Sequence, residues 1–345
     1  MPVKWDDERV DRAIRAADPA AASLDEGKSQ RAQLVLDEIL NGRRTDAATR
    51  FRPRRSSVRF WAPAAAVLVL VLVMIVAVPL TSTRAVALTP PVLTFDSRTG
   101  LTVEDLVDRS ITMLSEASAE AEPARGSRFV GWYLDATITD MGSTAVISPQ
   151  ITSVRWNPDL SGRITIVAGE PYSATGGPLP DPRPSGTAEP GTVLSDMTFE
   201  AGEYQPLSEV MPGDSSSEMR SFLASYGLPS TYNAGDIMLA VGGAFGEWTL
   251  SDRQHASILR LLADAPGAEV LGSGTDRAGR RVWGVRGIPS QADGASSQLM
   301  LISADTGRIV GLETMLTRAV EEPPLKAGSV ISYTMWDTNE GDLDQ

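Results

Sequence analysis

The sequence contains no cysteine and a single histidine, His255, and both shortages exclude particular chemistry. Without cysteine the chain forms no disulfide and offers no thiol nucleophile, no iron–sulfur ligand and no cysteine for a lipid anchor. With one imidazole it cannot build a histidine-rich metal site. We therefore expect any exported part of the chain to be stabilised by its hydrophobic core alone.

The sequence also lacks a recognisable catalytic motif. His255 lies on a predicted helix, where Ile258, Leu259 and Leu262 fall on the same apolar side, a pattern typical of a buried structural histidine. No Gly-x-Ser-x-Gly elbow is present to partner it in a Ser-His-Asp site. We therefore predict that the chain is not an enzyme, and we assign no catalytic residue.

Two stretches resemble ligand-binding loops without matching them. Residues 240–246 are glycine-rich but lack the Gly-Lys-Ser/Thr ending of a phosphate loop, so close helix packing explains them better. The acidic residues 337–344 lack the spacing of a calcium loop, and we interpret them as a solvated tail. We expect neither a cofactor nor a metal ion, and we assign no cofactor-binding or metal-binding residue.

Charge is unevenly distributed along the chain. Residues 1–59 carry 13 lysines and arginines against 10 acidic residues, whereas the remainder carries 18 against 34. An acidic surface repels both nucleic acid and anionic membrane surfaces. We therefore predict no nucleic-acid partner for the larger, C-terminal part.

The one long hydrophobic run covers residues 60–80 and reads FWAPAAAVLVLVLVMIVAVPL, 21 residues without a charge. A helix of about 20 residues is long enough to cross a hydrocarbon core of about 30 Å. Pro63 falls in the first turn, where its missing N–H is tolerated, and Trp61 is placed for the membrane interface. We predict one transmembrane helix at 60–80, in contact with the lipid bilayer.

The flanking charges predict the orientation of this helix. Seven arginines lie between Arg43 and Arg59, whereas Arg84 stands alone after the run. The positive-inside rule therefore predicts a single-pass cell-membrane protein with a cytoplasmic segment at 1–59, a stalk at 81–100 and an extracytoplasmic domain at 101–345. Cleavage after Ala87 stays open, although the segment before it is long for a signal peptide.

The predicted cytoplasmic segment contains two short amphipathic stretches, 6–16 and 27–41, separated by Asp18-Pro19. Helices of this size bury too little area to be stable alone. Two interpretations remain open. Either residues 1–45 become ordered on a cytoplasmic protein partner, or they form a loosely structured tail.

Beyond the predicted span, the pattern indicates an extended segment at 88–95, either a stalk or a first strand, and then an α+β domain. We expect an antiparallel sheet, flat or curved, with helices on one face. Ser251, followed by Gln254 three residues later, is typical of a capping box. The predicted helices are 102–122, 217–225, 236–245 and 251–264, and the predicted strands are 129–139, 146–156, 162–168, 268–274, 280–286, 298–303, 308–315 and 329–336.

Turn residues connect these elements. Gly279 and Gly307 close two short turns at positions where a positive φ is needed, and residues 157–162 have the composition of a hairpin turn. Residues 170–196 are rich in Pro, Gly, Ser and Thr and predict a surface loop. Core packing is the simplest role for the tryptophans of the domain, and a ligand pocket lined by some of them is the alternative; they are Trp132, Trp156, Trp248, Trp283 and Trp336.

Several short pieces, taken in order, resemble a family of actinobacterial single-pass membrane proteins of unassigned function. They are Ala16-Ala17-Asp18-Pro19-Ala20, the arginine-rich approach to the span, Leu88-Thr89-Pro90-Pro91, Arg155-Trp156, Ser161-Gly162-Arg163, Leu262–Gly267, Thr275–Gly279 and Asp305–Arg308. The resemblance implies a layout like that of membrane-bound anti-sigma factors. Because residues 1–59 contain neither His nor Cys, a zinc-dependent redox mechanism is excluded. The exported part also resembles, more weakly, the lipoprotein-carrier fold, a curved half-barrel that binds acyl chains.

Two functional hypotheses follow. In the first, the chain is a membrane-anchored regulatory sensor that holds a cytoplasmic partner such as a sigma factor through residues 1–45. In the second, the exported domain is a membrane-tethered binder of lipids or lipoproteins with an apolar ligand site.

Overall fold

The computed structural model describes residues 89–97, 100–116, 123–139, 142–174, 176–179, 187–292, 294–320 and 325–336. All of them belong to the second of two compact units of the chain, which spans 58–345. The predicted cytoplasmic segment, the predicted span at 60–80 and the acidic tail lie outside the described residues. Within the described ranges no helix is long and apolar enough to cross a membrane.

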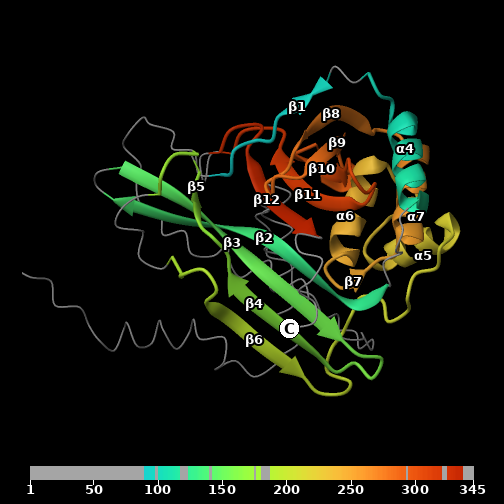
Figure 1. Cartoon of the computed structure of the whole chain (residues 1–345), viewed down its shortest axis with the longest axis horizontal. Helices are drawn as coiled ribbons and strands as arrows, with labels where there is room; N and C mark the ends of the chain where they lie inside the picture. Colours follow the sequence, from blue (N-terminus) through green and yellow to red (C-terminus); the bar gives the residue numbers. More distant parts are fainter. Residues whose placement is uncertain are drawn as a thin grey trace, which may run out of the picture. The chain divides into compact units, whose positions relative to one another are not determined.

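The described part of the chain is an α+β fold built on one large antiparallel sheet (Figure 1). The main path through the sheet is β1-β8-β9-β10-β11-β12-β2-β3-β4-β6, while β5 pairs with β3 and β7 pairs with β2 off this path. The strands are β1 Phe95–Asp96, β2 Ala124–Thr139, β3 Gly142–Trp156, β4 Gly162–Ala168, β5 Tyr172–Ser173, β6 Val193–Phe199, β7 Trp248–Thr249, β8 Glu269–Thr275, β9 Arg281–Gly287, β10 Ser296–Ser303, β11 Ile309–Leu316 and β12 Val330–Trp336.

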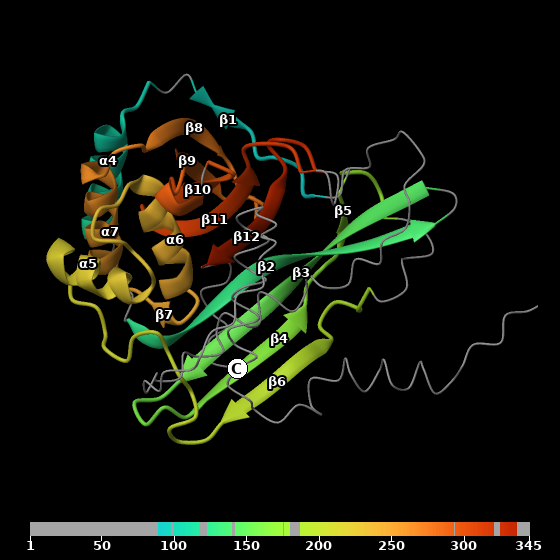
Figure 2. The same ribbon diagram turned by 180° about the vertical axis from the view of Figure 1, so that it is seen from behind.

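Four α-helices are described, and they gather on one face of the β8–β12 part of the sheet (Figure 2). They are α4 Val103–Glu116, α5 Ser216–Ser225, α6 Ala234–Ala244 and α7 Asp252–Asp264. The last three each begin with a capping box, and the one at Ser251 and Gln254 confirms the sequence prediction. We call the helix-covered side of the sheet its inner face and the opposite side its outer face.

The main hydrophobic core lies between the helices and the inner face. Large side chains fill it with almost no exposure; among them are Leu106, Ile237, Trp248, Ile258, Leu259, Met300 and Ile302. Side chains of successive strand residues point to opposite faces, so Leu299 and Leu301 belong to a separate cluster on the outer face. Seven of the eight residues of β10 are buried, which shows that both faces of this strand are covered.

The predicted elements of the C-terminal half agree closely with the structure, and the corrections fall in the middle of the chain. Strand β2 begins at Ala124 rather than at residue 129, and β3 begins at Gly142 rather than at residue 146. The predicted loop at 170–196 contains β5 and the start of β6, which forms one edge of the sheet. These strands were missed because turn residues surround them and β5 has only two residues.

The predicted turns and the glycine-rich stretch have the expected roles. Gly279 and Gly307 adopt positive φ values of 81° and 77°. In the hairpin turn between β3 and β4, however, the positive φ belongs to Leu160 rather than to a glycine. A Cβ on Gly242 would lie 3.1 Å from Leu312 Cδ2, and one on Gly243 would lie 3.2 Å from Tyr226 Cδ1. Close helix packing therefore explains the glycines of α6.

Candidate functional site

The most distinctive feature of the outer face is the segment that crosses it, residues 89–96, which we call the strap (Figure 1). Leu93 and Phe95 of the strap pack against the outer-face cluster formed by Val282, Leu299, Leu301 and Val310. The strap ends in β1, where Phe95 pairs with Gly274 of β8. Of the two sequence interpretations of this segment, the first strand is therefore confirmed at Phe95–Asp96, and the residues before it lie on the sheet.

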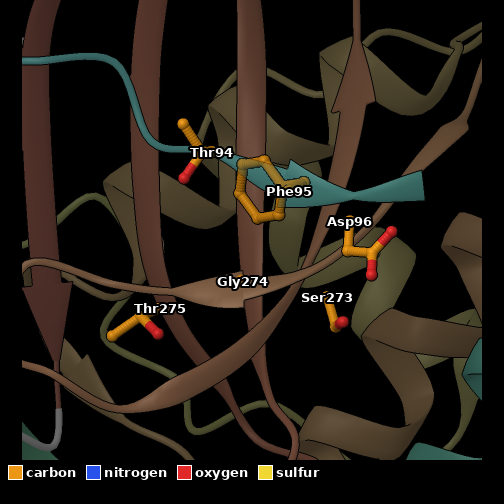
Figure 3. A pocket seen from close by; sticks show the side chains of 6 residues that line it. All are labelled: Thr94, Phe95, Asp96, Ser273, Gly274 and Thr275. Carbon is orange, nitrogen blue, oxygen red and sulfur yellow. The ribbon is translucent and has the colours of Figure 1, made fainter. Parts of the chain in front are cut away.

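Three glycines of the sheet allow the strap to approach this closely; Figure 3 shows Phe95 above β8, beside Gly274. A Cβ on Gly284 would lie 2.6 Å from Phe95 Cε1, and one on Gly274 would lie 2.6 Å from the carbonyl oxygen of Thr94. Gly272 has a φ of +111°, and a Cβ there would lie 2.0 Å from the carbonyl oxygen of Asp96. We call Gly272, Gly274 and Gly284 the glycine platform, because any side chain on it would displace the strap.

A buried ion pair clamps the other end of the strap. Arg277, in the turn after β8, donates from Nε to Glu313 Oε1 (2.7 Å) and from Nη2 to Glu313 Oε2 (3.1 Å). The same Nη2 donates to the carbonyl oxygen of Pro91 at 2.9 Å. The side chains of Arg277 and Glu313 are only 9% and 2% exposed. Burial raises the pKa of Glu313 above its ordinary value, and Arg277 opposes part of this rise.

Aromatic side chains surround this clamp. The guanidinium carbon of Arg277 lies 4.8 Å from the ring centroid of Tyr333, within cation–π range. The hydroxyl of Tyr172 donates to the hydroxyl of Tyr333 at 3.3 Å, and Trp132 stacks on the Tyr333 ring with centroids 6.4 Å apart. Strands β2, β5, β11 and β12 therefore all contribute side chains to the environment in which Arg277 holds the strap.

An apolar hollow of about 400 Å³ opens between the strap and the outer face. Ligand sites in proteins usually measure about 300–1,000 Å³, so the hollow is large enough for a small ligand. Its lining combines three strap residues with residues of β8 to β11 and the loop after β11; they are Val92, Leu93, Phe95, Leu271, Arg286, Ser297, Leu299, Met315, Leu316, Thr317 and Gly328. We call this space the strap hollow.

The strap hollow has one charged lining residue. Arg286 donates from Nε and Nη2 to Glu269 Oε2, at 3.1 and 2.5 Å. The Arg286 side chain is 44% exposed and that of Glu269 is 58% exposed, so water screens their attraction. Ser297, which is 5% exposed, and the exposed Thr317 add hydroxyl groups to a lining that is otherwise mostly apolar. The arrangement suits an apolar group that ends in an anionic or polar head.

A second depression, of about 540 Å³, lies at the junction of β1 and β8 (Figure 3). Four of its six lining residues have polar side chains. The lining consists of Thr94, Phe95, Asp96, Ser273, Gly274 and Thr275. It is more open to solvent than the strap hollow, so it offers a ligand less enclosure.

His255 is a structural residue, as the sequence predicts. It is 4% exposed, and its Nδ1 accepts a hydrogen bond from the backbone N–H of Ile309 at 3.2 Å. Its ring meets Phe245 edge to face, with centroids 5.1 Å apart. Burial, with a smaller contribution from Arg308, lowers the pKa of His255 to about 3, so the imidazole is neutral at physiological pH.

Glu247 is a second buried carboxyl group, on the helix-covered side of the molecule. Its Oε2 accepts hydrogen bonds from the hydroxyl of Tyr226 (2.8 Å) and from the backbone N–H of Leu207 (3.0 Å). Its backbone carbonyl accepts one from Nε1 of Trp156 at 3.0 Å. Burial raises the pKa of Glu247. These contacts tie the segment after β6 to the end of α6, which is a structural role.

The tryptophans divide between the two faces. Trp156, Trp248, Trp283 and Trp336 belong to the main core or pack against it, which confirms core packing for these four. Trp132 instead lies on the outer face with Tyr172 and Ile147. None of the five lines the strap hollow.

No site residue was predicted from the sequence, and the structure shows why the strap hollow was missed. Its lining comes from six segments far apart in the sequence, and most of it is ordinary strand residues. Two features of the sequence could have indicated the site. Leu93 and Phe95 have the alternating spacing of a strand, and glycines inside strands, here Gly272, Gly274 and Gly284, often mark places where another segment of backbone approaches closely. Among the described residues, no group of three or more acidic or histidine side chains is placed to hold a metal ion.

Comparisons with known proteins assign no family to the chain. No family model matches it, and no curated protein does. Among solved structures, MucB in complex with MucA(peri) shares 12% identity over 68% of this chain and 54% of that chain, with a TM-score of 0.24. The MucA/MucB complex of Pseudomonas aeruginosa gives 10% identity, coverages of 68% and 55%, and a TM-score of 0.21. This chain thus aligns with about half the length of those chains, and similarity at this level assigns no function.

Proposed function

We propose that the chain is a membrane-anchored regulatory protein, in which the exported domain responds to the state of the envelope and the predicted span carries the response to residues 1–45. The observation that supports this proposal is the docking of the strap. The strap begins nine residues after the predicted span ends at residue 80, and it is held on the domain by the Arg277 clamp and the glycine platform.

The proposal requires two states of the domain, one with the strap docked and one with the strap released. When it is docked, Pro91 is bound by Arg277 and Phe95 lies on the glycine platform. When it is released, the chain between the domain and the predicted span lengthens, and the outer-face cluster loses Leu93 and Phe95. An element with two discrete arrangements is what coupling between distant sites requires. A ligand or partner that favours one arrangement would thereby act on the segment next to the membrane.

On the cytoplasmic side, we propose that residues 1–45 bind a protein partner, with a sigma factor as the leading candidate. The test is affinity capture of the full chain from host membranes, compared with a chain that lacks residues 1–45. We expect one dominant partner with the full chain and its loss with the shortened chain. Identical partners from both chains would refute the regulatory function.

A second candidate function is the binding of lipids or lipoproteins by the exported domain. The strap hollow favours it, because the hollow is apolar, partly enclosed and of ligand size. This hollow lies on the outer face, whereas large buried side chains fill the space between the helices and the inner face. The two candidate functions are compatible, since a ligand in the strap hollow would contact the strap directly.

A further inference from the structure

We propose that the strap hollow binds a free fatty acid, with its acyl chain between the strap and the sheet and its carboxylate at Arg286. This inference rests on the second candidate function and names the ligand class and the position of the ligand. It requires three properties of the hollow: an apolar floor and wall, a volume that fits one chain, and a cation at the rim.

The apolar floor and wall come from opposite sides of the hollow. Leu271, Leu299 and Met315 of the sheet lie on one side, and Leu93 and Phe95 of the strap lie on the other. An extended methylene chain between them would bury apolar surface on both sides, which is the main driving force for binding such a ligand. Leu299 is already buried, so the surface that a ligand would cover belongs to the half-buried Leu271 and Met315 and to the strap.

The volume of the strap hollow favours a ligand with a single acyl chain. At about 400 Å³ the strap hollow lies near the lower end of the about 300–1,000 Å³ found for ligand sites. A lipid with two acyl chains and a large head group belongs nearer the upper end. The hollow is also partly open, so the polar end of a ligand need not be buried.

The cation at the rim favours a carboxylate. Among the described residues, Arg286 is the only charged one in the lining, and its present partner Glu269 does not line the hollow. Both Arg286 donors reach a single oxygen of Glu269, so that pair is not the fork-to-fork arrangement in which arginine binds a carboxylate most strongly. The described domain is acidic overall, and a local arginine is therefore needed to attract an acid.

The position of the ligand also has a regulatory consequence. Because strap residues form one wall, the affinity of the hollow for a fatty acid and the affinity of the strap for the sheet depend on each other. The acid would bind as a wedge beside Phe95, and occupancy would shift the strap relative to the glycine platform.

The test uses the full chain in washed membranes of expressing cells, without ATP or coenzyme A, so that added fatty acid remains free. The probe is a fatty acid that carries a photoreactive diazirine and an alkyne, and labelled peptides are located by mass spectrometry. We expect labelling in the peptides that contain residues 92–95 and 297–317. Growth of the cells with the same probe, which incorporates it into phospholipid, forms the second arm.

Two pairs of variants decide the assignment. Met315→Trp fills the hollow and should abolish labelling there, whereas Leu239→Trp, at an exposed position of α6 that does not line the hollow, should retain it. Arg286→Gln should weaken labelling about tenfold, since it removes a charge-assisted hydrogen bond. Arg281→Gln is its matched control, because Arg281 is in the same strand, is also paired with an acid at the surface and does not line the hollow.

Each outcome is informative. Labelling of the hollow in the first arm, lost in Met315→Trp and weakened only in Arg286→Gln, supports the proposal. Equal labelling of the hollow in Met315→Trp and Leu239→Trp overturns it, and so does labelling from the phospholipid arm alone. Labelling elsewhere in 101–345 overturns the proposed position but leaves lipid binding standing. The absence of label from 101–345 in both arms overturns the second candidate function as well, while the regulatory function is tested separately by partner capture.

Discussion

The two faces of the same sheet are covered in different ways. Four helices cover the inner face, with fully buried residues such as Ile258 and Leu259 between them and the strands. The outer face of β8 to β11 is covered by the eight residues of the strap. A buried ion pair holds the strap there, and a hollow of about 400 Å³ lies beneath it. The inner face therefore carries most of the large buried apolar side chains, whereas a single extended segment packs on the outer face of these strands.

The largest effect should come from breaking the clamp on the outer face. Arg277→Ala would leave Glu313 buried without its partner, which typically costs about 3–5 kcal/mol. The measurement is the free energy of unfolding of the α+β domain within the full chain, by pulse proteolysis in denaturant. Arg277→Ala combined with Glu313→Gln should recover part of the loss. A loss below about 1 kcal/mol, the range of surface ion pairs, would show that the clamp is not an effective buried pair.

A truncation on the inner face should cost nearly as much but leave the strap in place. Leu259 is 0% exposed, and Leu259→Ala should lower the free energy of unfolding by about 2–5 kcal/mol through lost burial and a new cavity. Protease sensitivity of residues 89–96 under native conditions should not change. Preferential cleavage of the strap in this variant would contradict the separation of the two faces.

A smaller effect is expected from one added methyl group on the glycine platform. Gly284→Ala would place its Cβ against the Phe95 ring and should cost about 1–3 kcal/mol through overpacking, with faster cleavage of the strap. In the Phe95→Ala background the same substitution should cost much less, which a double-mutant cycle measures. Gly242→Ala in α6 is the control for the inner face, and there strap cleavage should stay at the wild-type rate.

The effect that is smallest at neutral pH is a pH dependence that originates on the inner face. The pKa of His255 is lowered to about 3 in the folded state from 6.5 in the unfolded state. The neutral form is favoured on folding, so the stabilisation is complete above pH 6.5 and is lost as the pH falls toward 3. The contribution to the slope is at most about 1.4 kcal/mol per pH unit. In His255→Gln the free energy of unfolding should depend less steeply on pH between pH 6 and 4. An unchanged slope would show that other groups cause the pH dependence.

The sequence predicted the elements more completely than their arrangement. Apolar patterning located α5, α6 and α7, and a capping box marked the start of α7. The turn glycines located the β8–β9 and β10–β11 hairpins. Local patterns carry no information on pairing between distant strands, so neither the contact of β1 with β8 nor that of β2 with β12 was foreseen. The strap hollow was missed for the same reason. Its ligand-binding properties arise only when Leu93, Leu299 and Met315 are brought together.

The order of strands in the sheet has a consequence for folding. Strand β2, near the start of the described chain, pairs with β12 at its end, and β1 pairs with β8. Closing such pairings costs loop entropy before they contribute any stability, so sheets rich in them fold slowly. Because synthesis starts at the N-terminus, β2, β3 and β4 are present with an unpaired edge until β12 is made. We therefore expect the newly synthesised protein to depend on chaperones during this interval.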